Sequence, residues 1–130
     1  MSDQKPTIMV VEDESILLQA ISEKMKMEGV ETITCTSAEQ ALDYLGNLET
    51  PPDAIWLDYY LEGGGLNGLG FLEELKKNET WAKIPVLVVS NTASSEKVNK
   101  MTALGIVDYF VKAENDLGDL VKQAKKIVDR

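Results

Sequence analysis

Apolar runs alternate with amphipathic segments along the whole chain. Four mainly apolar runs, each bounded by turn or polar residues, predict strands at residues 7–11, 54–58, 84–90 and 106–111, and a weakly alternating segment predicts another at residues 30–35. Apolar residues recur with helical periodicity between and after them, at residues 15–28, 37–46, 68–78, 94–105 and 114–129. Strands that alternate with helices form right-handed βαβ crossovers. We therefore predict an α/β fold, a doubly wound five-stranded parallel sheet with five helices.

Capping residues support these boundaries. Ser37 and Gln40 have the spacing of a capping box, which predicts a helix start at Ser37. Gly29 and Gly46 stand where two helices are expected to end, because glycine adopts the left-handed conformation that closes a helix. No linker, repeat or low-complexity segment divides the chain. We expect a single domain over residues 1–130.

Composition narrows the classes of function. The formal net charge of −9 disfavours direct contact with nucleic acid or an anionic membrane, and it favours divalent cations or basic partners. No apolar stretch reaches membrane-spanning length, and no signal sequence is found. Cys35 is the only cysteine, so we expect a reducing compartment and a cytoplasmic protein. The chain has no histidine, which excludes histidine-based catalysis.

Polar residues stand at the carboxyl ends of the predicted strands. Glu12 and Asp13 follow the first strand, Asp58 ends the third, Ser90 ends the fourth, and Lys112 follows the fifth. Parallel strands bring these ends to one edge of the sheet, where open α/β folds build their sites. Taken singly, each residue has an ordinary explanation as a turn residue, a helix start or a surface lysine. Their joint placement favours a functional cluster.

Three carboxylates at one edge repel one another, so the cluster needs positive charge. Lys112 supplies one charge, and a hard divalent cation such as Mg²⁺ would supply two more through carboxylate and carbonyl oxygens.

Four segments at these strand ends make the chain similar to the receiver domain of bacterial two-component response regulators: Val10–Glu14, Trp56–Asp58, Val88–Ser90 and Gly105–Lys112. Each motif is short, but all four stand in register. The similarity extends over essentially the whole chain. It implies one receiver domain over residues 1–130, with the flavodoxin-like receiver topology and strand order 2-1-3-4-5.

The resemblance implies a role for each acidic residue. Asp58 corresponds to the phosphoacceptor, a carboxylate nucleophile that forms an aspartyl phosphate and also contacts the metal. Asp13 corresponds to a direct ligand of Mg²⁺ (or Mn²⁺), and Glu12 to an acid that acts through water. The backbone carbonyl of Tyr60 corresponds to the remaining protein ligand.

The resemblance also implies the groups that hold and sense the phosphoryl group. Ser90 and Lys112 correspond to the residues that contact its oxygens, and Ser90 and Tyr109 to the pair that switches conformation. The switch remodels the face of the fourth helix, fifth strand and fifth helix. In this chain that face is expected to include Lys97, Lys100, Met101, Leu104 and Tyr109.

The implied function is a signalling switch in a two-component phosphorelay. The phosphoryl group would come from a sensor histidine kinase, a phosphotransfer protein or a small phosphodonor. The output would be a downstream effector or a phosphorylation-dependent homodimer, without direct contact with nucleic acid or membrane. At most weak self-phosphorylation and autodephosphorylation are expected, so the chain is not an enzyme in the usual sense.

Three alternatives are weighed against this function. An aspartyl-phosphate phosphatase needs a second acid two residues after the nucleophile, where this chain has Tyr60. A flavin- or nucleotide-binding module needs a phosphate loop after the first strand, where this chain has acids. A degenerate receiver that serves as a constitutive interaction module stays open as the alternative function, although all key positions are filled.

The chain departs from the receiver pattern after Asp58. Glu62 stands where receivers commonly have proline, and Gly63-Gly64-Gly65 follows in a loop that is longer than usual. The glycines formally match a dinucleotide fingerprint, but they follow the third strand rather than the first. Tyr60 and Asn91 are bulky at positions that influence removal of the phosphoryl group by water. We therefore expect slow dephosphorylation.

Overall fold

The computed structural model describes residues 5–61, 65–91 and 94–129. Within them, one parallel sheet has the strand order β2-β1-β3-β4-β5, as predicted. Its strands are β1 Thr7–Val11, β2 Glu31–Cys35, β3 Ala54–Leu57, β4 Val86–Ser90 and β5 Asp108–Val111. The two central strands β1 and β3 pair in register from Ile8 with Ala54 to Val11 with Leu57.

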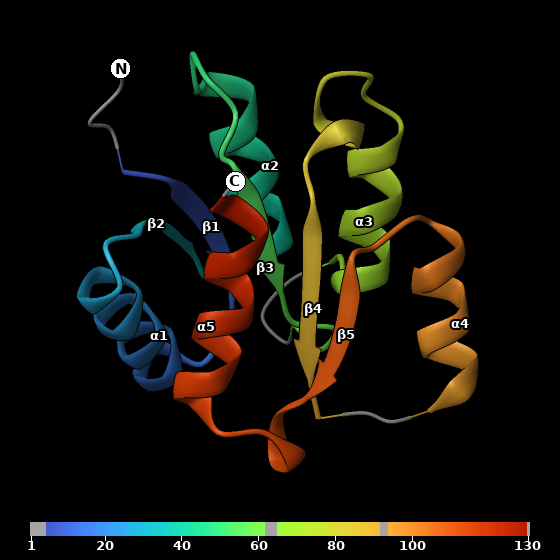
Figure 1. Cartoon of the computed structure of the whole chain (residues 1–130). Helices are drawn as coiled ribbons and strands as arrows, with labels where there is room; N and C mark the ends of the chain where they lie inside the picture. Colours follow the sequence, from blue (N-terminus) through green and yellow to red (C-terminus); the bar gives the residue numbers. More distant parts are fainter. Residues whose placement is uncertain (1–4, 62–64, 92–93, 130) are drawn as a thin grey trace.

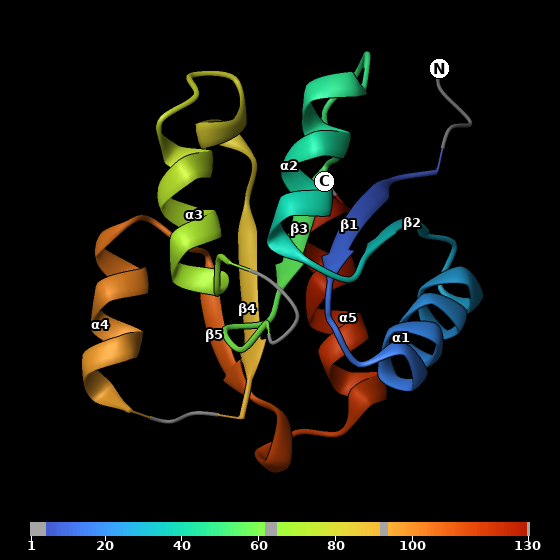
Figure 2. The same ribbon diagram turned by 180° about the vertical axis from the view of Figure 1, so that it is seen from behind.

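Helices cover both faces of the sheet, which confirms the doubly wound α/β fold. They are α1 Ser15–Met27, α2 Ala38–Asn47, α3 Gly68–Lys76, α4 Ser95–Ala103 and α5 Leu117–Val128. In Figure 1, α1 and α5 lie on one face, and in the reverse view of Figure 2, α2, α3 and α4 lie on the other. Two short 3₁₀ turns, η1 Trp81–Lys83 and η2 Lys112–Glu114, complete the described elements.

Alternate residues of each strand enter different cores. Met9 and Val11 pack with α2, α3 and α4, whereas Ile8 and Val10 pack with α1 and α5. All four are at most 1% exposed. Burial of each such side chain contributes about 1.5–3 kcal/mol, so the central strands are fixed in register by both layers. The carboxyl ends of these strands are therefore held in the same register.

The helix boundaries agree with the sequence prediction to within three residues, and two of the differences involve the residues chosen as helix ends. Gly46 lies inside α2, which continues to Asn47, whereas Gly29 follows α1 with a φ of +80° as expected for a closing glycine. The last helix begins at Leu117 rather than near 114, because the chain first forms the turn η2. Asp116 then has the extended backbone of a residue that precedes a helix.

The carboxyl ends of the strands meet at one edge of the sheet, at the bottom of Figure 1. The connections into the helices leave from this edge, which places residues distant in sequence side by side. In the described part of the chain, no helix is both long and apolar enough to cross a membrane.

Candidate functional site

Backbone hydrogen bonds fix Glu12 and Asp58 where β1 and β3 end. The Glu12 N–H donates to the Cys35 carbonyl at the end of β2 (3.0 Å), and the Asp58 N–H donates to the Val11 carbonyl at the end of β1 (3.1 Å). The parallel ladder thus continues one residue past each strand. The backbone of both residues is therefore held by the neighbouring strand.

The structure brings Glu12, Asp13 and Asp58 together, as predicted. One carboxylate oxygen from each residue lies within 4.8 Å of the others. Glu12 is 1% exposed and Asp58 4% exposed, while Asp13 is half-buried. Carboxylates that are this close together and buried from solvent repel one another strongly unless a cation balances their charge.

Lys112 provides one balancing charge. Its Nζ donates to Glu12 Oε1 (2.7 Å) and Asp58 Oδ2 (3.1 Å), and its side chain is 18% exposed. Burial alone would lower the pKa of Lys112, but the two carboxylates outweigh burial and raise its pKa. Lys112 is therefore held in its charged form, and it reaches the site from the first residue of η2.

The environment of Glu12 favours its protonated form. Burial raises the pKa of Glu12 to about 6, and the nearby Asp58 charge adds to this, while Lys112 acts in the opposite direction. With all groups ionised, three carboxylates and one ammonium leave a formal charge of −2. That charge matches one divalent cation.

The donor set fits such a cation. Carboxylate oxygens are the ligands that Mg²⁺ and Mn²⁺ prefer. The backbone N–H of Tyr60 donates to Asp58 Oδ1 (3.3 Å), so the chain turns back toward the cluster directly after Asp58. The metal role of the Tyr60 carbonyl stays a prediction.

Ser90 and Tyr109 lie on neighbouring strands beside this cluster. Ser90 ends β4 and is fully buried, and Tyr109 lies on β5, which pairs with β4. The half-buried Tyr109 ring packs against the α2–α4 core, whereas its neighbour Phe110 packs on the opposite face of the sheet. Burial raises the pKa of the Tyr109 phenol, with the Ser90 hydroxyl acting in the opposite direction. The two residues thus influence each other electrostatically.

A contact that the sequence did not predict links α4 to the residues after Asp58. Lys97 Nζ donates a hydrogen bond to the Tyr60 hydroxyl. The same ammonium lies 5.0 Å from the ring centroid of Tyr59 and 4.7 Å from that of Tyr60. The two rings meet edge to face, with centroids 5.0 Å apart. A cation and two aromatic rings therefore lie together at the residues that directly follow Asp58.

Gly68 is a second residue whose role the sequence did not reveal. Its N–H donates to the Tyr59 carbonyl (2.7 Å), and a Cβ at Gly68 would lie 2.4 Å from the backbone oxygen of Asp58. Only glycine allows the first residue of α3 to approach the Asp58 backbone so closely. Asn67 caps the same helix by accepting from the Gly70 N–H (2.9 Å).

The glycine loop that departs from the receiver pattern is described only in part. Residues 62–64, which include Glu62, Gly63 and Gly64, lie outside the described residues. Beyond them, Glu39 Oε2 accepts from the backbone N–H groups of Gly65 (3.1 Å) and Leu66 (2.9 Å). These backbone N–H groups lower the pKa of Glu39. The end of the loop is thus tied to α2.

The sequence prediction placed Met101 on the surface of the face formed by α4, β5 and α5, and this placement is wrong. Met101 is 0% exposed and belongs to the core beneath α4, so it cannot contact a partner. Leu104 is partly buried against the same core. Lys100 is exposed and pairs with Glu96 (3.4 Å), and Val107 before β5 is 53% exposed. The surface of this face is therefore more polar than expected.

Comparison with known proteins identifies the family. The model of the response regulator receiver domain matches residues 8–125. The chain belongs to this family. It is 31% identical over 122 residues to a putative NtrX-like response regulator of Rickettsia felis, covering 92% of this chain and 25% of that protein. It is 30% identical over 126 residues to the phosphate regulon regulator PhoB of Pseudomonas aeruginosa, covering 95% of this chain and 52% of PhoB. The chain thus spans a quarter to half of these relatives.

Solved structures of receiver domains have the same fold. The receiver domain of NtrX from Brucella abortus superimposes with a TM-score of 0.81 at 28% identity, covering 94% of this chain and 98% of that one. The Mn²⁺-bound form of response regulator Rcp1 superimposes with a TM-score of 0.81 at 25% identity, covering 95% and 93%. The predicted receiver topology is therefore confirmed.

Proposed function

We propose that this receiver domain is a phosphorylation-controlled switch in which Asp58 accepts a phosphoryl group. The observation that carries the proposal is the buried Asp58 carboxylate, hydrogen-bonded to Lys112 and within 4.8 Å of the Glu12 and Asp13 oxygens. Phosphoryl transfer needs little covalent work from a protein, but it needs positioning and cations on the transferred oxygens. This cluster offers both.

The reaction is a displacement at phosphorus. An Asp58 carboxylate oxygen attacks the phosphorus of the donor and forms the new P–O bond of an aspartyl phosphate. The bond from phosphorus to the donor breaks, and the leaving group departs with its electron pair. Lys112 is placed to stabilise the charge on one phosphoryl oxygen, and the Ser90 hydroxyl to donate to another.

The metal site belongs to the same proposal. Asp13 and Asp58 would bind Mg²⁺ or Mn²⁺ directly, with Glu12 acting through water and the Tyr60 carbonyl completing the protein ligands. When bound, the ion supplies positive charge that screens Asp58 from the incoming phosphoryl oxygens. The formal charge of −2 on the ionised cluster supports this role, as does the Mn²⁺-bound neighbour Rcp1.

The output follows from the neighbours of the site. A phosphoryl group beside Ser90 biases the Ser90–Tyr109 pair, and with it the face of α4, β5 and α5. That face would then bind an effector or a second copy of the chain. The donor is a histidine kinase or phosphotransfer protein, or a small phosphodonor. Ile16, 82% exposed on the first turn of α1, offers an apolar contact to a donor protein.

Intact mass spectrometry tests the proposal. The chain is incubated with acetyl phosphate and Mg²⁺, beside the variant Asp58→Asn and a sample with chelator. We expect one added phosphoryl group that is absent from both controls. An adduct that persists in Asp58→Asn would assign the acceptor to another residue. No adduct at any time would favour a constitutive interaction module that is not phosphorylated.

A further inference from the structure

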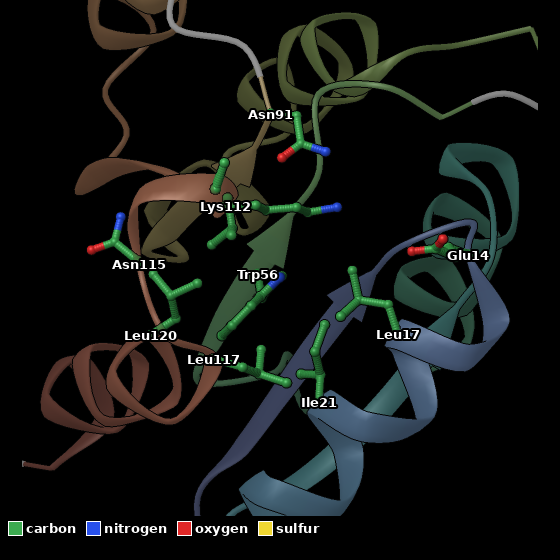
Figure 3. A pocket seen from close by; sticks show the side chains of 11 residues that line it. Glu14, Leu17, Ile21, Trp56, Asn91, Lys112, Asn115, Leu117 and Leu120 are labelled. Atoms are coloured by element: carbon green, nitrogen blue, oxygen red, sulfur yellow. The ribbon is translucent and has the colours of Figure 1, made fainter.

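A pocket of about 340 Å³ lies between α1 and α5, on the face of the sheet opposite α3. Its walls are aliphatic side chains from both helices, and its floor is the indole of Trp56 (Figure 3). The volume lies in the range of small-molecule sites. The aliphatic walls are formed mainly by Leu17, Ile21, Leu117 and Leu120.

The floor carries a hydrogen-bond donor without a partner. Trp56 is 1% exposed, and its Nε1 has no hydrogen-bond partner among the described residues. An indole N–H can only donate, and burying a donor unpaired is costly, so nearly all such groups in folded proteins are satisfied. Phenylalanine would fill the same core position without this cost. The unpaired donor therefore points to a missing acceptor.

The direction of the donor indicates where that acceptor belongs. Figure 3 shows the indole nitrogen pointing toward the space between Leu17 and Lys112, on the pocket side of the ring. The nitrogen is closed from bulk solvent. Leu17 is only half-buried, so a rotation of its side chain would open the pocket to the Trp56 N–H. An occupant would then accept from Trp56 while its body fills the aliphatic space.

Charge at the pocket selects a neutral occupant. Glu14 lines the mouth and repels anions. Lys112 also lines it, but its ammonium is already bound to Glu12 and Asp58. The Asn115 side-chain N–H₂ donates to the Val111 carbonyl (2.9 Å). The groups at the rim thus offer no free cation to a carboxylate ligand, whereas a carbonyl oxygen needs only the indole donor.

We propose that this pocket binds a small neutral molecule with an apolar body and one carbonyl-type acceptor, which accepts a hydrogen bond from Trp56 Nε1. The site is separate from phosphoryl transfer at Asp58, and it stands whether or not that reaction occurs. Lys112 and Asn91 line the pocket near the sheet edge, so the two sites are neighbours.

The experiment uses cyclohexanone as the neutral carbonyl probe. The chain has two tryptophans, so a ¹⁵N spectrum contains two indole N–H signals, and Trp81 serves as the internal reference. The variant Trp81→Phe assigns them. We expect cyclohexanone at millimolar concentration to shift the Trp56 signal in a saturable manner and to leave the Trp81 signal in place. An unmoved Trp56 signal would overturn the proposal, because the probe would then not reach the indole donor.

Two matched probes separate the hydrogen bond from the apolar contact. Methylenecyclohexane has the shape of cyclohexanone without the acceptor, and it should bind about tenfold more weakly. Cyclohexanecarboxylate carries a negative charge and should also bind more weakly. Equal binding of the ketone and the hydrocarbon by the unaltered chain would overturn the role of Trp56 without any variant.

Two variants locate the site. Trp56→Phe should abolish the preference for the ketone over the hydrocarbon, measured by the backbone signals of α1 and α5. Leu117→Trp should fill the pocket and abolish the shift of the Trp56 signal while leaving the donor present. A cyclohexanone shift of normal size in Leu117→Trp would place the probe elsewhere.

Discussion

The two sides of Asp58 are built differently. On the inner side, Glu12 and Lys112 form a nearly buried ion pair fixed by strand ends at the centre of the sheet. On the outer side, Tyr60 is 43% exposed and meets Lys97 from a separate helix. If Asp58 is the phosphoacceptor, the fixed inner side would stabilise charge on the phosphoryl group, and the outer side would influence how water reaches it. We therefore expect substitutions on the inner side to change both the free energy of unfolding and phosphorylation of Asp58. Substitutions on the outer side should change mainly the rate of dephosphorylation.

The largest effect should come from Lys112→Met, which keeps the length of the side chain and removes its charge. Glu12 and Asp58 would be left buried and unpaired, which costs about 3 kcal/mol in the free energy of unfolding. Phosphorylation by acetyl phosphate should fall at least about 100-fold, because no ammonium meets the phosphoryl oxygens. Urea unfolding with chelator and intact mass measure the two effects.

The matched control is Lys125→Met. Lys125 pairs with Asp129 at 3.3 Å on the surface of α5, with side chains that are 36% and 52% exposed. Surface pairs contribute less than about 1 kcal/mol. Equal losses of unfolding free energy in Lys112→Met and Lys125→Met would contradict a special role of the buried pair.

Mg²⁺ should restore part of the lost stability in Lys112→Met, because binding to the folded state adds to the free energy of unfolding.

Gly68→Ala should have the second largest effect. Its Cβ would lie 2.4 Å from the Asp58 backbone oxygen and 2.7 Å from Tyr59 Cα, and backbone atoms cannot yield as a flexible side chain can. We expect a loss of about 2 kcal/mol in the free energy of unfolding, with slower phosphorylation because Asp58 is displaced. The measurement is urea unfolding beside the intact-mass time course.

Gly46 offers the control for this substitution. It lies inside α2, and nothing stands within 4 Å of an added Cβ. Gly46→Ala should therefore stabilise the chain by about 0.5–1 kcal/mol, since alanine loses less entropy in a helix. A Gly68→Ala variant as stable as Gly46→Ala would show that α3 can move away from the acceptor without cost.

These two glycines also show what the sequence could and could not predict. Gly46 was expected to end α2, but a glycine inside a helix costs only about 1 kcal/mol, which packing of the helix outweighs. Gly68 was placed at the start of α3 without a further role. Its importance depends on a close approach to Asp58 across the loop, and no local pattern encodes that distance.

The inner side of the site was predictable because strand periodicity fixes it. An apolar run that ends on a carboxylate must deliver that carboxylate to the sheet edge, so Glu12, Asp13 and Asp58 could be grouped in advance. The outer side depends on which helix face meets which loop. Lys97 was assigned to the output face, and its contact with Tyr60 arises only from the tertiary packing of α4. Met101 was misplaced for the same reason.

Cys35 allows a smaller, pH-dependent test of the inner side. It ends β2, where its carbonyl accepts from Glu12, and burial raises the pKa of its thiol from 9.0 to about 12. The folded state keeps a proton that the unfolded state loses above pH 9. This contribution to stability is full below pH 9 and is lost as the pH rises toward 12. At pH 10 the loss is about 1.4 kcal/mol.

The comparison of the chain with Cys35→Ala isolates that contribution. The variant should be less stable at pH 8, because a buried side chain is shortened, but it should lose less stability than the unaltered chain between pH 8 and pH 10. Parallel losses would mean that the thiol is accessible in the folded state. Reaction of Cys35 with a disulfide reagent at pH 8 checks this directly, and it should occur only as fast as the chain opens.

The smallest change in stability, and the clearest separation of the two sides, should come from Tyr60→Ala and Lys97→Gln. Tyr60 is 43% exposed and Lys97 is partly exposed, so the free energy of unfolding should change little in either variant. If Tyr60 shields the aspartyl phosphate from water, its removal should speed dephosphorylation several-fold, and the loss of Lys97 should have a weaker effect in the same direction. Lys100→Gln, three residues further along α4 and paired only with Glu96 in the described contacts, is the control. The decay of the phosphorylated mass after removal of acetyl phosphate measures all three. An unchanged rate in Tyr60→Ala would remove the proposed shield, and an unchanged rate in Lys97→Gln alone would mean that Tyr60 holds its position without α4.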